Sequence, residues 1–104
     1  MDTSHVPAPR VALSLAEVEA LVCTFDWPCA TAVCIAWAES EGEWWAESET
    51  DDHGLMQLNR PTYERVFGER WAGVYEPARN VELAYEVFER WGRTFGAWTS
   101  AGDC

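Results

Sequence analysis

Hydrophobic residues recur at helical spacing in two well-separated stretches of the chain. The first predicts an amphipathic helix over residues 14–25 and carries its apolar positions at Leu15, Val18, Leu21, Val22 and Phe25. Ser14 and Glu17 at its start have the spacing of a capping box. The second predicts a helix from about Pro77 to Trp91, stopped by Gly92, with Val81, Ala84, Tyr85, Phe88 and Trp91 on one face.

Between these helices, residues 29–38 are apolar on nearly every face. Asp26, Trp27 and Pro28 form a turn signal before them, with Asp26 or Trp27 expected near the N-cap. A helix without a polar face belongs inside a fold. We therefore expect a mainly α protein in which this central buried helix is surrounded by the others.

The segment that follows is polar and then abruptly apolar. Residues 41–53 carry six carboxylates without periodicity and predict a loop, with some strand character around Trp44 and Trp45. The next five residues, GLMQL, predict a strand or a tight connection. Residues 60–67 predict a short helix ended by Gly68, with another short piece near 70–74, and the aromatic tail after Phe95 is expected to pack back over the core.

The length of 104 residues favours one domain, which we place at residues 14–104 after a lead-in of residues 1–13 that contains Pro7 and Pro9. Apolar residues make up 48% of the chain, which argues for a folded protein. Seven tryptophans exceed what one small core needs, so we expect some in a groove where sugar faces can stack. We expect a monomer.

The charge is strongly acidic, with 18 acidic residues against seven basic ones and a net charge of −11. Phosphate binding needs clustered Lys and Arg, so nucleic acid is not an expected partner, and neither is an anionic membrane surface. No run of residues approaches transmembrane length, and the N-terminus has neither the basic start nor the apolar region of a signal peptide.

Four cysteines stand at positions 23, 29, 34 and 104, and the sequence leaves all three pairings open. A Cys23–Cys29 bond could clip the turn between two helices, whereas Cys34 could equally be a small buried hydrophobe. The spacing matches no zinc pattern, so we expect no metal and no cofactor.

Glu39 ends the apolar helix and is the first candidate for chemistry. A general acid must still hold its proton near neutral pH, and partial burial and the negative end of a helix dipole both favour the protonated form of a carboxyl group. The alternative is a solvated acid at a helix end, and Glu41 fits such a position about as well. Spacing alone does not decide between these interpretations.

Glu39-Ser40, a polar loop and then Gly54-Leu55-Met56-Gln57-Leu58-Asn59 together resemble the lysozyme-like soluble lytic transglycosylases. Tyr75-Glu76-Pro77 with Asn80 and Ala84-Tyr85 is similar to a later stretch of that family, and residues 98–102 are similar to the end of its actinobacterial and phage members. The resemblance spans about residues 12–102 and implies an α+β lysozyme-like fold with its short strand segment beside the active-site cleft.

The resemblance implies an enzyme that cleaves the β-1,4 bond between N-acetylmuramic acid and N-acetylglucosamine in peptidoglycan. It implies that Glu39 is general acid and base, that Ser40 lies beside the substrate N-acetyl group, and that Gly54, Leu55, Met56 and Gln57 form one wall of the cleft. Asn59, Trp44 and Tyr85 are further candidates for contact with the glycan, Tyr85 as a helper of Glu39.

Three functions stay open at this point. A lytic transglycosylase needs one carboxyl group, whereas a hydrolase of the same bond needs a second acid, for which Asp51 and Asp52 are candidates. A lysozyme-like module that binds glycan without cleaving it is the third. The sequence lacks the Pro that usually follows the family's Glu-Ser pair and lacks its AYNAG motif. We expect action on the cell wall, with phage origin favoured by the short lead-in.

Overall fold

A computed structural model describes residues 9–104, so most of the predicted lead-in, including Pro7, lies outside the described residues. The described elements follow the order α1 (Leu15–Val22), α2 (Cys29–Ser40), β1 (Asp52–His53), β2 (Leu58–Asn59), α3 (Arg60–Phe67), the 3-10 helix η1 (Gly68–Gly73), α4 (Pro77–Arg90) and the 3-10 helix η2 (Thr99–Asp103). The prediction of a mainly α fold is confirmed. No described helix is both long and apolar enough to cross a membrane.

Helix α1 begins as its sequence predicts. The Ser14 hydroxyl accepts from the Glu17 amide at 3.1 Å, and the Glu17 carboxylate accepts from the Ser14 amide at 2.9 Å, which completes the capping box. The helix ends at Val22, three residues earlier than predicted, because the chain turns there into a loop closed by the Cys23–Cys29 disulfide. Pro28, rather than Asp26 or Trp27, occupies the N-cap of α2.

Helix α2 is less enclosed than its composition predicts. Ala32, Ile35 and Ala36 are buried, but Ala30 and Ala38 are exposed. The open face lines an apolar depression of about 470 Å³ together with α1 and the C-terminus. The described residues leave this face of the helix only partly covered.

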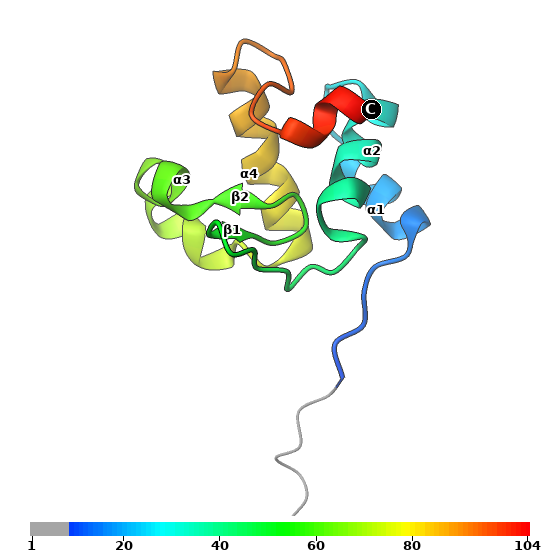
Figure 1. Ribbon diagram of the computed structural model, residues 1–104, viewed down its shortest axis with the longest axis horizontal. Coiled ribbons are helices and arrows are strands. Elements are labelled where there is room, and N and C mark those ends of the chain that lie inside the picture. The colour runs from blue at the N-terminus through cyan, green and yellow to red at the C-terminus, as the bar shows by residue number, and fades with distance from the viewer. Residues whose placement is uncertain (1–8) are drawn as a thin grey trace, which may run out of the picture.

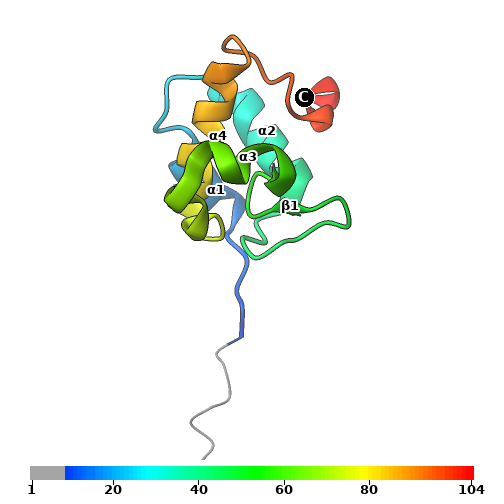
Figure 2. The same cartoon turned by 90° about the vertical axis from the view of Figure 1, so that its left-hand side faces the viewer.

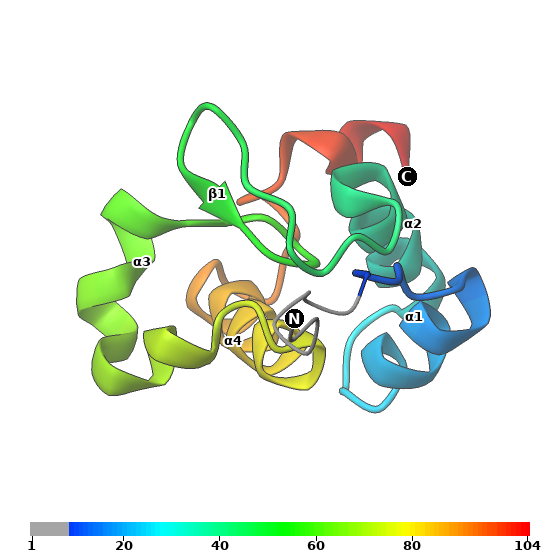
Figure 3. The same cartoon turned by 90° about the horizontal axis from the view of Figure 1, so that it is seen from below.

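Helix α4 supplies the largest share of the core and lies in the middle of the molecule, between α3 on one side and α1 and α2 on the other (Figure 1 and Figure 3). Its buried residues are Asn80, Val81, Leu83, Ala84, Val87 and Phe88. Pro77 stands in its first turn and Gly92 follows its end, as predicted.

The two strands form a small antiparallel hairpin in which Asp52 pairs with Asn59 and His53 with Leu58. Residues 54–57 are the tight turn between them, which confirms the predicted connection. The strand expected around Trp44 and Trp45 is wrong, because both residues lie in a turn. Figure 2 shows the hairpin and the loop before it projecting from one side of the helices.

The C-terminal segment leaves α4, crosses the molecule and brings η2 against α2 (Figure 1 and Figure 3). Trp98 is buried just before η2, and its indole Nε1 donates to the Met56 carbonyl at 2.8 Å. Cys104 is bonded to Cys34 of α2, which selects one of the three open pairings. The tail therefore packs back over the core as predicted.

Candidate functional site

Glu39 is the penultimate residue of α2, and its side chain is half-buried. Its Oε2 atom accepts a hydrogen bond of 2.6 Å from the Ser100 hydroxyl on η2. Glu39 lines an open depression of about 240 Å³, together with Ala38, Ser40, Glu41, Glu43 and Ala46. The site thus presents a carboxyl group that is shielded on one side and held by one donor.

Ser40 lines the same depression, but its hydroxyl is turned back into the helix. It donates to the Ala36 carbonyl at 3.3 Å, and the residue is 7% exposed. Contact with a substrate N-acetyl group stays a prediction for this residue.

The turn at residues 54–57 depends on Gly54 and Asn80. Gly54 has φ +82°, and a Cβ atom there would lie 2.2 Å from the Asn80 amide nitrogen. The fully buried Asn80 side chain accepts from the Met56 amide at 2.8 Å and donates to the His53 carbonyl at 3.1 Å and the Val74 carbonyl at 2.8 Å. This amide clamps the hairpin to the N-terminal end of α4.

The turn is linked to the Glu39 depression by hydrogen bonds from the Gly54 amide and the Gln57 side chain to the Ala46 carbonyl. Leu55 and Met56 are fully buried, so their side chains contribute packing and are not available to a ligand. Gln57 has φ 53° and is half-buried, and its Nε2 donates to the carbonyls of Ala46 at 3.1 Å and Gly54 at 3.0 Å. Since Ala46 lines the depression with Glu39, the hydrogen bond from Gln57 holds one of the lining residues in place.

The two candidate second acids have different surroundings. Asp52 accepts from the hydroxyls of Ser48 (2.8 Å) and Thr50 (2.5 Å) and from the Asn59 amide (3.0 Å). Burial raises the pKa of Asp52, but these three donors outweigh it and hold the pKa below its ordinary value. Asp52 is therefore an ionised carboxylate at neutral pH.

Asp51 is tied to Arg60, whose guanidinium donates to both of its oxygens at 2.9 to 3.1 Å. The hydrogen bonds from Arg60, and then that from His53, hold the pKa of Asp51 below its ordinary value. Successive strand residues face opposite sides, so Asp52 points away from the side on which Asp51 meets His53. Of the two, Asp52 is the carboxylate that remains without a cationic partner among the described residues.

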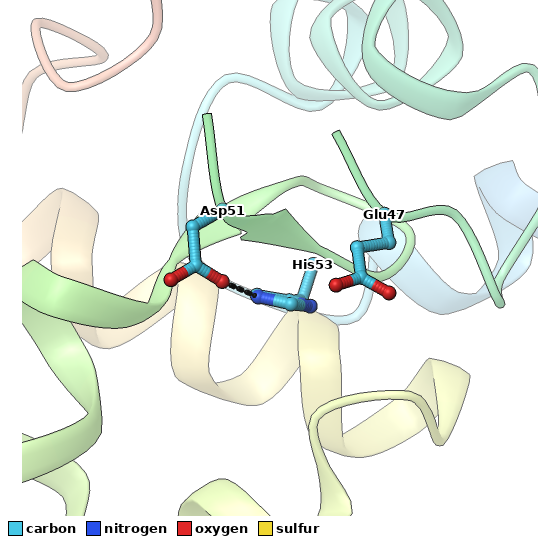
Figure 4. A group of neighbouring side chains, drawn as sticks. All are labelled: Glu47, Asp51 and His53. Carbon is cyan, nitrogen blue, oxygen red and sulfur yellow. Dashed lines mark hydrogen bonds and ion pairs between the residues drawn. The ribbon is translucent and has the colours of Figure 1, made fainter. Parts of the chain in front are cut away.

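His53 is buried at the centre of a cluster with Asp51 and Glu47, which Figure 4 shows. Its Nε2 lies 2.5 Å from Asp51 Oδ1 and its Nδ1 lies 2.5 Å from the Tyr75 hydroxyl. Burial raises the pKa of Tyr75, and the charges of Glu47 and Asp51 act in the same direction. His53 was expected to be a loop residue but is part of β1.

This cluster is also the group of described residues best placed to hold a cation. Ligand atoms of Glu47, Asp51 and His53 lie within 4.8 Å of one another. However, both ring nitrogens of His53 already lie against protein oxygens, and Arg60 occupies Asp51. Protein groups thus occupy His53 and Asp51 without an ion, whereas Glu47 is exposed. The expected lack of a metal stays a prediction.

Of the predicted contact residues, only Ser40 lines the Glu39 depression, and residues 54–57 do not line it. Trp44 and Asn59 do not line it either. Trp44 donates from Nε1 to the Val11 carbonyl at 3.0 Å and lines a different depression with Arg10, Trp45, Glu47 and Tyr75. Asn59 is the N-cap of α3, where it accepts from the Thr62 amide at 3.1 Å. Both are therefore held by structural hydrogen bonds.

Tyr85, the predicted helper of Glu39, belongs to an aromatic cluster beside the Cys23–Cys29 turn. Its ring stacks on Phe25 at 5.0 Å, and its hydroxyl accepts from Arg93 at 3.3 Å. The hydroxyl that reaches Glu39 is that of Ser100, because the disulfide and Trp98 bring η2 to the end of α2.

Sequence reasoning missed Ser100 and the clamp formed by Asn80. A signal for Asn80 exists, because its amide stands four residues before Ala84 on the apolar face of the predicted helix, where a buried polar group must be paired. Ser100 has no such signal, because a serine near a chain end is common and its contact spans 61 residues.

Comparisons with known proteins give one match. A family model described as transglycosylase SLT domain matches residues 18–101, which covers Glu39, the hairpin turn and most of η2. Neither the comparison with curated proteins nor that with solved structures finds a match. The mainly α architecture with its small hairpin agrees with the lysozyme-like fold that the resemblance implied.

Proposed function

The chain belongs to the transglycosylase SLT domain family, and from this premise we propose that it is a peptidoglycan lytic transglycosylase with Glu39 as its general acid and base. The bond cleaved is the β-1,4 linkage between N-acetylmuramic acid and N-acetylglucosamine. The observation that carries the proposal is the half-buried Glu39 carboxyl, which lines an open depression and is held by Ser100 beside the wall braced by Gln57.

The mechanism follows from one carboxyl group. Glu39 donates its proton to the glycosidic oxygen as the bond to the muramic acid C1 carbon breaks and positive charge grows there. The substrate's own N-acetyl oxygen stabilises that charge. The Glu39 carboxylate then removes the proton from the C6 hydroxyl of the same sugar, and that oxygen attacks C1. The product is a 1,6-anhydro sugar, and Glu39 is protonated again without consumption of water.

Hydrolysis of the same bond is the second candidate, favoured by the environment of Asp52. Three donors keep this carboxylate ionised, and no described cation neutralises it. An ionised acid paired with a protonated one is the arrangement that glycoside hydrolases use. In that case water replaces the C6 hydroxyl and the product has a reducing end.

Digestion of purified peptidoglycan, followed by mass spectrometry of the released fragments, tests both candidates. Glu39→Gln keeps the size of the side chain but cannot donate a proton as an acid, so we expect activity to fall by about 10²–10⁴-fold. Glu19→Gln, an equal charge change on the exposed face of α1, serves as the control. Full activity of Glu39→Gln would overturn the assignment.

The products and Asp52→Asn separate the two reactions. Anhydro ends, with Asp52→Asn close to wild type, support the transglycosylase. Reducing ends that disappear in Asp52→Asn support the hydrolase. If the wild type releases no fragments of either kind, the remaining function is that of a module that binds glycan without cleaving it. A sedimentation assay with insoluble peptidoglycan detects such binding. We propose the cell wall as the place of action.

A further inference from the structure

Ser100 is the point at which the C-terminal segment touches the proposed catalytic group. Its hydroxyl donates to Glu39 Oε2 at 2.6 Å, and the bond joins residues 61 positions apart. A short hydrogen bond to the carboxyl group fixes the rotamer of a side chain that otherwise samples several. The orientation of Glu39 therefore depends on where η2 is held.

Two anchors hold η2, one on each side of Ser100. Two residues before it, the buried Trp98 donates to the Met56 carbonyl. Four residues after it, Cys104 is bonded to Cys34 in the middle of α2. No residue of η2 is fully buried, and Ala101 is its only half-buried apolar residue. The disulfide is therefore the anchor that keeps the C-terminal half of η2 against α2.

We propose that Ser100 is a positioning residue for Glu39 and that the Cys34–Cys104 disulfide keeps Ser100 in place, so that reduction of this bond lowers the glycan-cleaving activity. The inference rests on the proposed function of Glu39. In the reduction, a dithiol supplies two electrons and two protons. The S–S bond breaks, Cys34 and Cys104 become thiols, and the dithiol becomes a cyclic disulfide. Of the two residues, Cys104 is exposed and Cys34 is half-buried.

The first test compares Ser100→Ala with Ser100→Thr. Removal of the hydrogen bond that orients Glu39 should lower kcat roughly tenfold, whereas KM should stay near wild type because Ser100 is not proposed to touch the glycan. Threonine keeps the hydroxyl, so Ser100→Thr should retain most of the activity. A merely structural role predicts a loss in both variants. Full activity of Ser100→Ala would overturn the positioning role.

The second test removes the disulfide. The pair Cys34→Ser with Cys104→Ser should lose about as much kcat as Ser100→Ala, and addition of Ser100→Ala to that pair should cause little further loss. The pair Cys23→Ser with Cys29→Ser is the matched control, because it removes a disulfide that does not touch η2. Independent, multiplicative losses would overturn the link between the disulfide and Ser100.

Dithiothreitol on the folded wild type tests the same bond without mutation, with far-UV circular dichroism to show that the helices remain. Activity should fall, and it should fall equally in the Cys23/Cys29 serine variant, which retains only Cys34–Cys104. Glu39→Gln separates the two proposals: if it is inactive while Ser100→Ala is fully active, only the positioning role fails. If Glu39→Gln is active, the catalytic assignment fails.

Discussion

Asn80 shows how a single residue can decide the shape of the hairpin. It is fully buried, and its amide pairs with the Met56 amide and with the carbonyls of His53 and Val74. Removal of the side chain would take a hydrogen-bond partner from each of these backbone groups. The residue therefore connects the proposed active-site wall to α4 without contacting a ligand itself.

Asn80→Ala should accordingly lower the free energy of unfolding by about 3 kcal/mol, because buried backbone groups lose their partners. Asn59→Ala, which removes a partly exposed helix cap, should cost only about 1 kcal/mol. Chemical denaturation followed by circular dichroism measures both values. Equal losses in the two variants would contradict the role given to Asn80.

Gly54 depends on the same clamp. Gly54 and Gly92 both have positive φ, at +82° and +71°, but only at Gly54 would a Cβ meet nearby atoms, the Asn80 amide at 2.2 Å and the Val74 carbonyl at 2.6 Å. Gly92→Ala should cost about 1 kcal/mol from backbone strain alone. Gly54→Ala should cost at least about 3 kcal/mol, because the clamp must also move. Thermal unfolding of the two variants should differ clearly, and similar melting temperatures would contradict this account.

At the scale of elements, an ion pair next to the hairpin makes the stability of the fold depend on pH. Asp51 links the loop to Arg60 at the start of α3, and its pKa is held below the ordinary value by that guanidinium. A lowered pKa means that folding favours the ionised form. The stability from Asp51 is then complete above the ordinary aspartate pKa of about 3.9 and is lost as the pH falls through the lower value in the folded protein.

Asp51→Asn tests this dependence. The difference in unfolding free energy between wild type and variant should be constant from pH 7 to about pH 5 and should shrink below about pH 4, where the wild-type carboxylate becomes protonated. Urea denaturation at several pH values measures it. A difference that stays constant to pH 2.5 would show that the ion pair with Arg60 does not contribute.

Most elements could be predicted because their determinants are local. Ser14 with Glu17, Pro77 and the glycines after α3 and α4 mark helix ends through contacts within a few residues. The openness of α2 could not be predicted, because burial depends on which distant segments pack against a helix. Strand β1 fell outside the predicted place because Trp44 and Trp45 favour strands, whereas pairing was decided by the turn at Gly54.

The site divides in the same way. Glu39 and the GLMQ turn come from short motifs, so sequence alone proposes them. Ser100, the Asn80 clamp and the assignment of Asp51 to Arg60 depend on contacts between distant segments or on which way a strand residue faces. Leu55 and Met56 share a motif with Gln57, yet they are core residues, since a motif does not tell which of its members face a ligand.

At the scale of the whole molecule, the net charge is −11, and the basic residues that offset the acidic ones are unevenly distributed over the described part of the chain. The described ion pairs of Arg60, Arg70, Arg79 and Arg93 lie on the hairpin, α3 and α4 or just beyond them. By contrast, the depression at Glu39 is also lined by Glu41 and Glu43, and no basic residue is among its described lining residues. Anionic peptidoglycan would therefore approach a negative surface.

We expect the activity to rise with moderate salt for this reason. Between about 20 and 150 mM NaCl the screening length shortens to about 8 Å, so long-range repulsion between the wall polymer and this surface weakens and encounter becomes faster. The initial rate of peptidoglycan solubilisation should increase roughly twofold or more over that range. A variant with Glu41→Gln and Glu43→Gln should show a smaller increase, since part of the repulsion is removed. The control variant carries Glu64→Gln and Glu69→Gln, the same charge change at exposed positions of α3 and η1. It should respond more like wild type. A steep fall of wild-type activity with added salt would show that attraction, and not repulsion, governs the approach to the wall.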